Sequence, residues 1–275
     1  MLKLIGINKA STLPLFCPTH DSEVFAPLEQ CDFTGTPEQC FLLAYRVVCN
    51  EYLKKRNQRD RVALAKTLDR GKTIQQQMEI QAMMRAYEAS VEAGFLDLER
   101  QKREFDKALA KRDFSRLHAY VISFDALPQV LASGVLSPEC DFDGHTLQSL
   151  ATLDARLDII THSLIAAKTG GAFVFAGLDI SDRAPRTLAQ SLDRVPDDKI
   201  ANSVLRFVFE FCENHYINPE WWEGLDEDVK KALSERFATS ADPTKPRIHS
   251  TCLRDDGFSP VDWQVTGRSW APLPR

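Results

Sequence analysis

The stretch LDIITHSLIAAKTGGAFVFAGL, residues 157–178, decides the fold because it reads as two strands joined by a tight turn. Its two flanks, 157–167 and 172–178, are rich in β-branched and aromatic residues, which favour an extended chain. Between them, KTGG at 168–171 places two glycines where a strand connection needs a turn. We therefore expect two neighbouring antiparallel strands in this stretch.

Two further segments with strand propensity precede this stretch. HAYVISF, residues 118–124, and VLASGVL, residues 130–136, are short, apolar and rich in β-branched residues. Together with 157–178 they predict a small antiparallel sheet that spans about residues 117–179.

Helical patterns lie on both sides of this predicted sheet. Thr36 can cap a helix that starts with Pro37, and the apolar residues that follow recur with a helical period. Residues 60–113 are polar, free of proline and rich in helix formers, which predicts two or three antiparallel helices or a protruding hairpin. Further helices are expected at about 183–193, 197–216 and 226–238. The expected fold class is α+β, helix-dominated, with the sheet between helical parts.

Proline breaks both ends of the chain. Pro14, Pro18 and Pro27 exclude a long helix before residue 35, and five prolines follow residue 242, so we expect an irregular start and a tail that wraps the surface. We divide the chain into residues 1–116, an irregular segment plus a helical hairpin, and residues 117–275, the sheet with the C-terminal helices and tail. One continuous domain is the alternative.

Composition places this chain among ordinary globular proteins, with 44% hydrophobic and 27% charged residues. No run of about 18 apolar residues predicts a membrane-spanning helix. The first 12 residues lack the apolar core of a secretory signal, so we expect a cytoplasmic protein. Seven scattered cysteines, an odd number, favour reduced thiols over a disulfide framework.

Charge is uneven along the sequence. The net charge of −5 argues against nucleic-acid binding by the whole surface. Residues 54–72, however, hold eight Lys or Arg against two Asp, while residues 210–228 hold seven acids and no Lys or Arg. The basic segment is the best candidate for contacts with phosphates or with a partner, and the acidic segment of the same chain could equally receive it. The candidate binding residues are Lys54, Lys55, Arg56, Arg59 and Arg61.

Two Cys-x-x-His pairs are the candidate zinc ligands. Cys17 and His20 lie on a predicted turn, and Cys212 and His215 lie three residues apart on a predicted helix, so each pair can present both side chains to one ion. A joined four-ligand zinc site would need tertiary contact between the pairs. The alternative is that Cys212 is a buried core thiol and that His215 lies at the end of a helix.

Catalytic interpretations have less support. Cys17 and His20 could act as nucleophile and base, but no third group is placed to orient the histidine. Acidic residues near glycines could instead hold a divalent ion. These residues are Glu139, Asp141 and Asp143 in one segment and Asp255, Asp256 and Asp262 in the other. No motif identifies a catalytic residue, so the sequence leaves open whether the protein is an enzyme.

The segments FCPTHDSEVFAPLE (16–29) and CFLLAYRVVCNEY (40–52) resemble a group of uncharacterised bacterial proteins with no assigned activity. The later segment FEFCENHYINPEWWEGL (209–225) is also similar to that group. The resemblance implies a zinc-knuckle-like segment to which Cys17 and His20 contribute the second half. The upstream Cys-x-x-Cys half is missing from this chain, and no His-Asn-His arrangement implies a nuclease.

Two functions follow as expectations. The first is a bacterial binding or regulatory protein that contacts a protein or nucleic-acid partner, in a defence or mobile-element context. The second is a metal-dependent hydrolase of the nuclease or toxin type, in which an acidic cluster does the chemistry.

Overall fold

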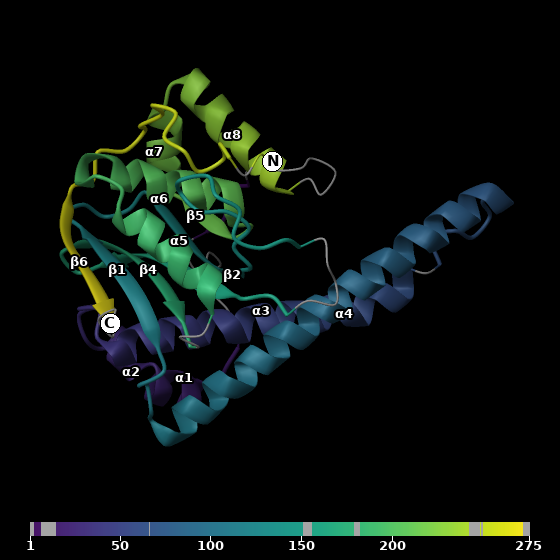
Figure 1. Ribbon diagram of the computed structural model, residues 1–275, viewed down its shortest axis with the longest axis horizontal. Coiled ribbons are helices and arrows are strands. Elements are labelled where there is room, and N and C mark those ends of the chain that lie inside the picture. Colours follow the sequence, from purple (N-terminus) through teal and green to yellow (C-terminus); the bar gives the residue numbers. More distant parts are fainter. Residues whose placement is uncertain are drawn as a thin grey trace.

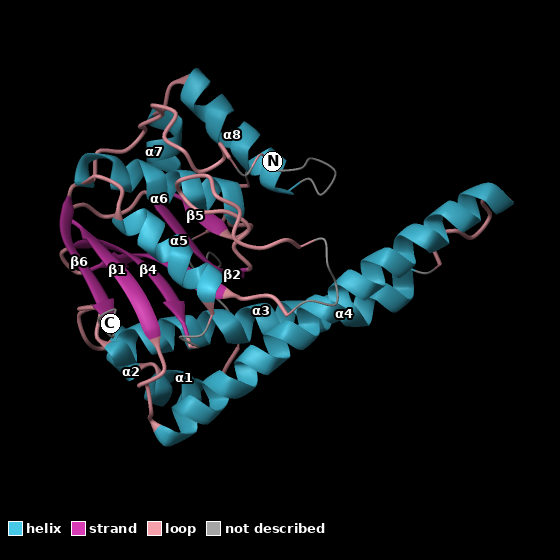
Figure 2. Ribbon diagram, in the orientation of Figure 1, coloured by secondary structure: helices cyan, strands magenta, loops and turns pink. Residues whose placement is uncertain are grey.

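The structure is a computed structural model that describes residues 3–6, 15–65, 67–150, 156–178, 182–241, 248 and 250–271. One six-stranded sheet lies between two helical layers (Figure 2). All its strand pairs are antiparallel, in the order β5-β2-β3-β4-β1-β6. The strands are β1 (His118–Phe124), β2 (Val130–Leu136), β3 (Ile160–Ala167), β4 (Gly170–Gly177), β5 (His215–Ile217) and β6 (Val265–Ala271).

The two strands predicted from residues 157–178 form the centre of the sheet. β3 and β4 pair from Thr161 opposite Ala176 to Ala167 opposite Gly170. Gly170 has a φ of +147°, and a Cβ at this position would lie 2.0 Å from the carbonyl oxygen of Phe124. The turn therefore requires glycine because the neighbouring strand β1 comes too close for any side chain.

The sheet extends beyond the predicted range of 117–179 at both edges. The helix expected over 197–216 ends at Phe211, because Cys212 is already extended, and residues 215–217 pair with β2 as β5. The tail, expected only to wrap the surface, adds β6 to the free edge of β1. In both cases an open strand edge offers backbone groups to a passing segment, which local sequence patterns do not reveal.

Eight helices occur in the described residues, and the α+β prediction is confirmed. Two short helices interrupt the start of the chain, which was expected to be irregular up to residue 35. The helices are α1 (Pro18–Val24), α2 (Ala26–Glu29), α3 (Pro37–Ala65), α4 (Ile74–Lys111), α5 (Arg183–Asp193), α6 (Asp197–Phe211), α7 (Pro219–Gly224) and α8 (Glu227–Ala241).

The long helices α3 and α4 form an antiparallel hairpin whose far end projects away from the sheet (Figure 1). This is the protruding hairpin that was one of the predictions for residues 60–113, and its second helix, α4, is continuous over 38 residues. It begins at a capping box, in which the Thr73 side chain accepts from the backbone of Gln76 and the Gln76 side chain accepts from the backbone of Thr73. Gly94 stays helical, since a single glycine costs only about 1 kcal/mol in so long a helix.

Each face of the sheet has its own apolar core. Alternation along β1 sends Tyr120 and Ile122 to the core under α5, α6 and α8, and Val121 to the core under α1–α4. The first core centres on Phe207 of α6, whose ring centroid lies 5.1 Å from that of Phe175. The second core joins residues from both sides of the predicted boundary at 116, and the division into two domains stays a prediction.

Candidate functional site

The N-terminal Cys-x-x-His pair forms an exposed corner at the start of α1. Cys17 is the residue before the helix and His20 lies in its first turn, which brings the Cys17 Sγ within 3.2 Å of the His20 Nδ1. Asp21 follows and lies 4.0 Å from Arg46, which also holds Glu29 at 2.6 Å. The two predicted ligands therefore meet, as the spacing indicated.

The second Cys-x-x-His pair is not a pair in space. The Cys212 Sγ lies 2.8 Å from the Nε2 of His162 on β3, while the His215 Nδ1 lies 3.2 Å from the backbone oxygen of Cys212. Cys212 belongs to the core under α6, whereas α1 lies on the opposite side of the sheet (Figure 1). The structure does not bring Cys17 and His20 to Cys212 and His215, because α6 ends before residue 212 and its last turn faces the core.

The buried Cys212–His162 pair was missed by the sequence analysis. Both residues are almost fully buried, and His162 lies over Gly134, where a Cβ would be 2.9 Å from the ring. Burial lowers the pKa of His162 to about 3 and raises the pKa of Cys212 well above its usual value. Both groups are therefore neutral near pH 7 and joined by a hydrogen bond that holds β3 to the end of α6.

One group of metal-ligand residues does assemble among the described residues, namely Asp141, Asp143 and His145. Asp141 is buried, and its Oδ1 accepts from the backbone N–H groups of Asp143 (3.0 Å) and His145 (2.8 Å). Its Oδ2 lies 3.2 Å from the His145 Nδ1. One ligand atom from each residue lies within 4.8 Å of the others, so the group could hold a metal ion.

The loop that carries these three residues is held to the end of α5 and to the C-terminal segment. Asp143 pairs with Arg194, and its backbone oxygen accepts from the Nε of Arg254 at 3.1 Å. Cys140 lies in the same loop, with its Sγ 3.4 Å from that of Cys252. Sequence reasoning found Asp141 and Asp143 but not His145, although the four-residue spacing from Asp141 was visible.

Two residues of the second predicted acidic cluster, Asp255 and Asp256, pair with cations of the same chain. Arg206, which is 2% exposed, contacts Asp255 at 3.4 Å and Asp256 at 3.0 Å. Lys199 reaches Asp255 at 2.7 Å, and Arg236 pairs with Asp256. A hydrogen bond from Lys199 and another from the Gly257 backbone lower the pKa of Asp255. These carboxylates fasten the C-terminal segment to α6 and α8.

The predicted basic residues lie where the hairpin leaves the sheet. We call residues 54–92 of this hairpin the arm; its far end projects beyond the sheet (Figure 1). Lys54 and Arg61 lie on one flank of α3, whereas Arg59 turns to the opposite side and pairs with Glu92 at 2.8 Å. The five predicted residues therefore do not form one patch, because a helix turns each residue by about 100°.

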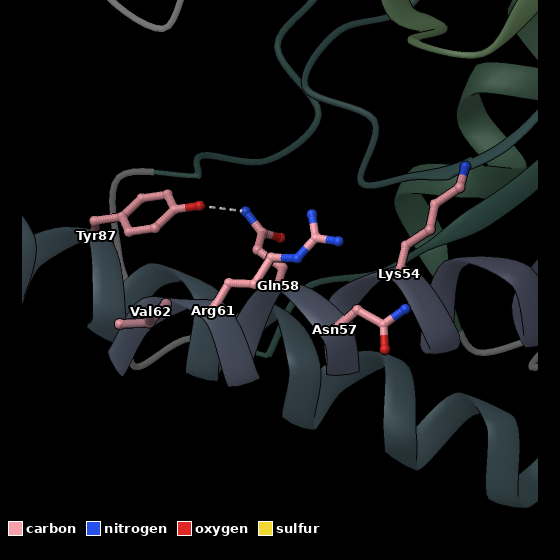
Figure 3. Close-up of a pocket in the computed structure, with 6 residues that line it drawn as sticks. All are labelled: Lys54, Asn57, Gln58, Arg61, Val62 and Tyr87. Carbon is pink, nitrogen blue, oxygen red and sulfur yellow. Dashed lines mark hydrogen bonds between the residues drawn. The ribbon is translucent and has the colours of Figure 1, made fainter. Parts of the chain in front are cut away.

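Lys54 and Arg61 line a pocket of about 450 Å³ on the arm (Figure 3). Tyr87 of α4 closes one end, and its hydroxyl accepts a hydrogen bond of 2.7 Å from the Gln58 side chain. No ion pair joins Arg61 to another residue that the structure describes. Folding thus brings an aromatic ring to the basic segment, which itself contributes the two amides of Asn57 and Gln58. The lining residues are Lys54, Asn57, Gln58, Arg61, Val62 and Tyr87.

The arm differs in charge from the rest of the chain. Its sequence holds nine Lys or Arg against five Asp or Glu, a net charge of +4. Since the whole chain has a net charge of −5, the remaining residues, 1–53 and 93–275, carry −9. We call these remaining residues the body. The charge separation noticed along the sequence therefore becomes a separation in space, with a basic arm on an acidic body.

Two findings bear on the identity of the chain. No helix among the described residues has the length and apolar character needed to cross a membrane. Comparisons with protein-family models, with curated proteins and with solved structures gave no match.

Proposed function

We propose that this protein is a binding protein whose arm contacts the phosphate backbone of a nucleic acid. The observation that carries the proposal is the pocket in which Lys54 and Arg61 flank two side-chain amides and Tyr87. Phosphates are bound in proteins by groups of this kind, with cations supplying the attraction and amides and hydroxyls supplying additional hydrogen bonds.

The chemistry of the pocket favours backbone contact over sequence recognition. Lys54 already has a carboxylate partner, Glu51 at 2.8 Å, so Arg61 is the cation with the most free charge. A single aromatic ring offers one stacking surface, which is sequence-tolerant because every base has a flat face. The acidic body repels the same polymer and directs it to the arm.

Fluorescence anisotropy with a labelled duplex and a labelled single strand of mixed sequence tests this proposal. We expect affinity to fall steeply between about 50 and 200 mM NaCl, because binding to phosphates releases counterions. The double variant Lys54→Glu/Arg61→Glu should weaken binding at least about tenfold. It should also reduce the salt slope by about 2, since each of the two cations neutralises one phosphate in the wild-type complex.

A matched control changes the same two residue types on the body. Arg183 and Lys231 are exposed on α5 and α8, so Arg183→Glu/Lys231→Glu alters the net charge equally without touching the arm. Equal reductions in affinity for both double variants would mean that binding follows net charge alone. Absence of wild-type binding at about 50 mM NaCl would also refute the proposal.

A metal-dependent hydrolase is the second candidate, favoured by the Asp141, Asp143 and His145 group. Two carboxylates and an imidazole suit zinc or manganese, and zinc is the ion we propose. Elemental analysis of the purified protein and of Asp141→Asn, together with a nuclease assay in added zinc, tests this role. Asp255→Asn is expected to keep the metal. Equal metal content in wild type and Asp141→Asn would exclude this group.

A further inference from the structure

Helix α4 carries two apolar faces, of which only one is covered. Met84, Val91, Phe95 and Leu98 are buried on the face that packs against α3. A helix in an ordinary two-helix hairpin is polar on the other side.

The outer face of α4 instead carries exposed apolar residues, which share the face with Gln75, Arg85 and Glu92. Ile74 is 79% exposed, Met78 71% and Leu96 53%. Between Met78 and Leu96 lie four alanines, of which three are exposed and Ala93 is half-buried. At about 100° per residue, the whole set falls within a strip about 120° wide that faces away from α3. We call it the outer strip; its members are Ile74, Met78, Ala82, Ala86, Ala89, Ala93 and Leu96.

We propose that two copies of this chain pair antiparallel through the outer strip to form a four-helix bundle. The order of side chains along the strip makes it complementary to itself. With the two-fold axis between residues 87 and 88, Ala86 of one copy lies level with Ala89 of the other, and Ala82 with Ala93. The alanines let the helices approach to about 8 Å. At both ends, Met78 then packs on Leu96 of the second copy.

The charged side chains beside the strip fit the same pairing. No ion pair joins Arg85 to another residue of the described structure, and Arg85 lies toward the edge of the strip that also carries Glu92, which Arg59 of α3 holds at 2.8 Å, with Glu88 just outside this edge. In this register Arg85 lies level with the interval between Glu88 and Glu92 of the second copy. A parallel pair would place Arg85 beside Arg85, which repels.

The size of the strip sets the strength of the dimer. From Ile74 to Leu96 it extends about 33 Å, with a helix width of about 10 Å. The product of these lengths, about 330 Å² per partner, is smaller than the roughly 800 Å² per partner of a standard stable interface. We therefore expect a dissociation constant in the micromolar range. The pocket stays open in the dimer, because Tyr87 lies on a different flank of α4.

Two exposed methionines on α4 provide a matched test. Met78 belongs to the outer strip, whereas Met83, 62% exposed, lies about 140° away around the helix from Met78. Sedimentation velocity of the full chain over a range of concentrations should show a monomer–dimer equilibrium. Met78→Arg should raise the dissociation constant at least about 30-fold, and Met83→Arg should change it less than about threefold. Circular dichroism should show unchanged helicity in both.

A photo-crosslink identifies the register. The photoreactive amino acid p-benzoylphenylalanine at position 78 should link to the segment around Leu96 in a product of twice the chain mass. The same group at position 83 should give no such product. Within one straight helix, positions 78 and 96 are about 27 Å apart, so the link must join two copies. A chain that stays monomeric at the highest concentration, or a dimer equally insensitive to both arginine variants, would overturn the proposal.

Discussion

The body and the arm hold their arginines differently. In the body, Arg206 is 2% exposed and its guanidinium group contacts Asp255 and Asp256. On the arm, Arg59 is 48% exposed and pairs with Glu92, itself 40% exposed. In the first ion pair the cation is buried and its carboxylates are exposed to water, so removing the carboxylates would leave a buried charge, whereas water screens both groups of the second pair.

The same contrast holds for apolar side chains. Phe207 is enclosed by other aromatic rings on α6 and the sheet, whereas Met78 and Leu96 of the hairpin lie mainly in water. Stability is therefore concentrated in the body. Because the exposed side chains of the arm contribute little to stability, their substitutions can be read as effects on binding. Three of the four predictions below test this difference between the regions.

The largest loss of stability is expected from Phe207→Ala. Its ring centroid lies 5.9 Å from that of Phe173 and 5.1 Å from that of Phe175, so truncation opens a cavity in the first core. We expect the free energy of unfolding to fall by about 4 kcal/mol in urea titrations. Met84→Ala, in the thin interface of the arm, should cost about 2 kcal/mol. Equal losses of unfolding free energy for Phe207→Ala and Met84→Ala would contradict the difference in stability between body and arm.

Arg206→Gln should be next, with a loss of about 2 kcal/mol, because a buried guanidinium loses its hydrogen bonds to two carboxylates that water still reaches. The glutamine keeps a polar side chain but leaves Asp255 and Asp256 without their buried cation. The C-terminal segment should then loosen, which limited proteolysis can detect as faster cleavage near residues 250–258. A loss below about 1 kcal/mol would mean that Lys199 and Arg236 suffice to hold these carboxylates.

The third prediction concerns pH. The pKa of His162 is lowered to about 3 in the folded state from an ordinary value of 6.5, so only the unfolded chain takes up its proton between these values. Stability from this group is complete above pH 6.5 and falls by about 1.4 kcal/mol per unit as pH drops toward 3. Compared with wild type, His162→Gln should remove this slope between about pH 6.5 and 4.5, while the exposed His20→Gln should retain it.

Arg59→Gln should have the smallest effect. Its ion pair with Glu92 is half-exposed and its guanidinium carbon lies 4.8 Å from the centre of the Phe95 ring. We expect a loss of about 0.5 kcal/mol, reduced further in high salt because counterions screen the pair. A loss as large as that of Arg206→Gln would remove the distinction between the two regions.

Local patterns predicted much of this fold. Residues 157–178 gave the two central strands because β-branched residues and a Gly-Gly turn coincide there, and Thr36-Pro37 located the start of α3. The excess of Lys and Arg in residues 54–61 could be read directly from the sequence. Each of these features depends on neighbours within a few residues, which is the range that propensities describe.

Features that depend on distant residues could not be predicted in this way. β6 pairs with β1, and the Cys212 Sγ meets His162 rather than His215, across 50 residues of sequence. The Cys17–His20 pair was predicted on a turn and lies instead at the start of helix α1. Its separation from Cys212 depends on the sheet between them. Likewise, Tyr87 joins Lys54 and Arg61 only because the hairpin folds back on itself.

The pairing of β1 with β6 also has a consequence for protein synthesis. About 140 residues separate Phe124 from Val265, and a ribosome adds about 5 to 20 residues per second. One edge of β1, a strand of buried apolar residues, therefore stays open for about 7 to 28 s after it leaves the exit tunnel. During that time it can pair with another nascent chain, so we expect the yield of folded protein to depend on how closely ribosomes follow one another on the messenger RNA.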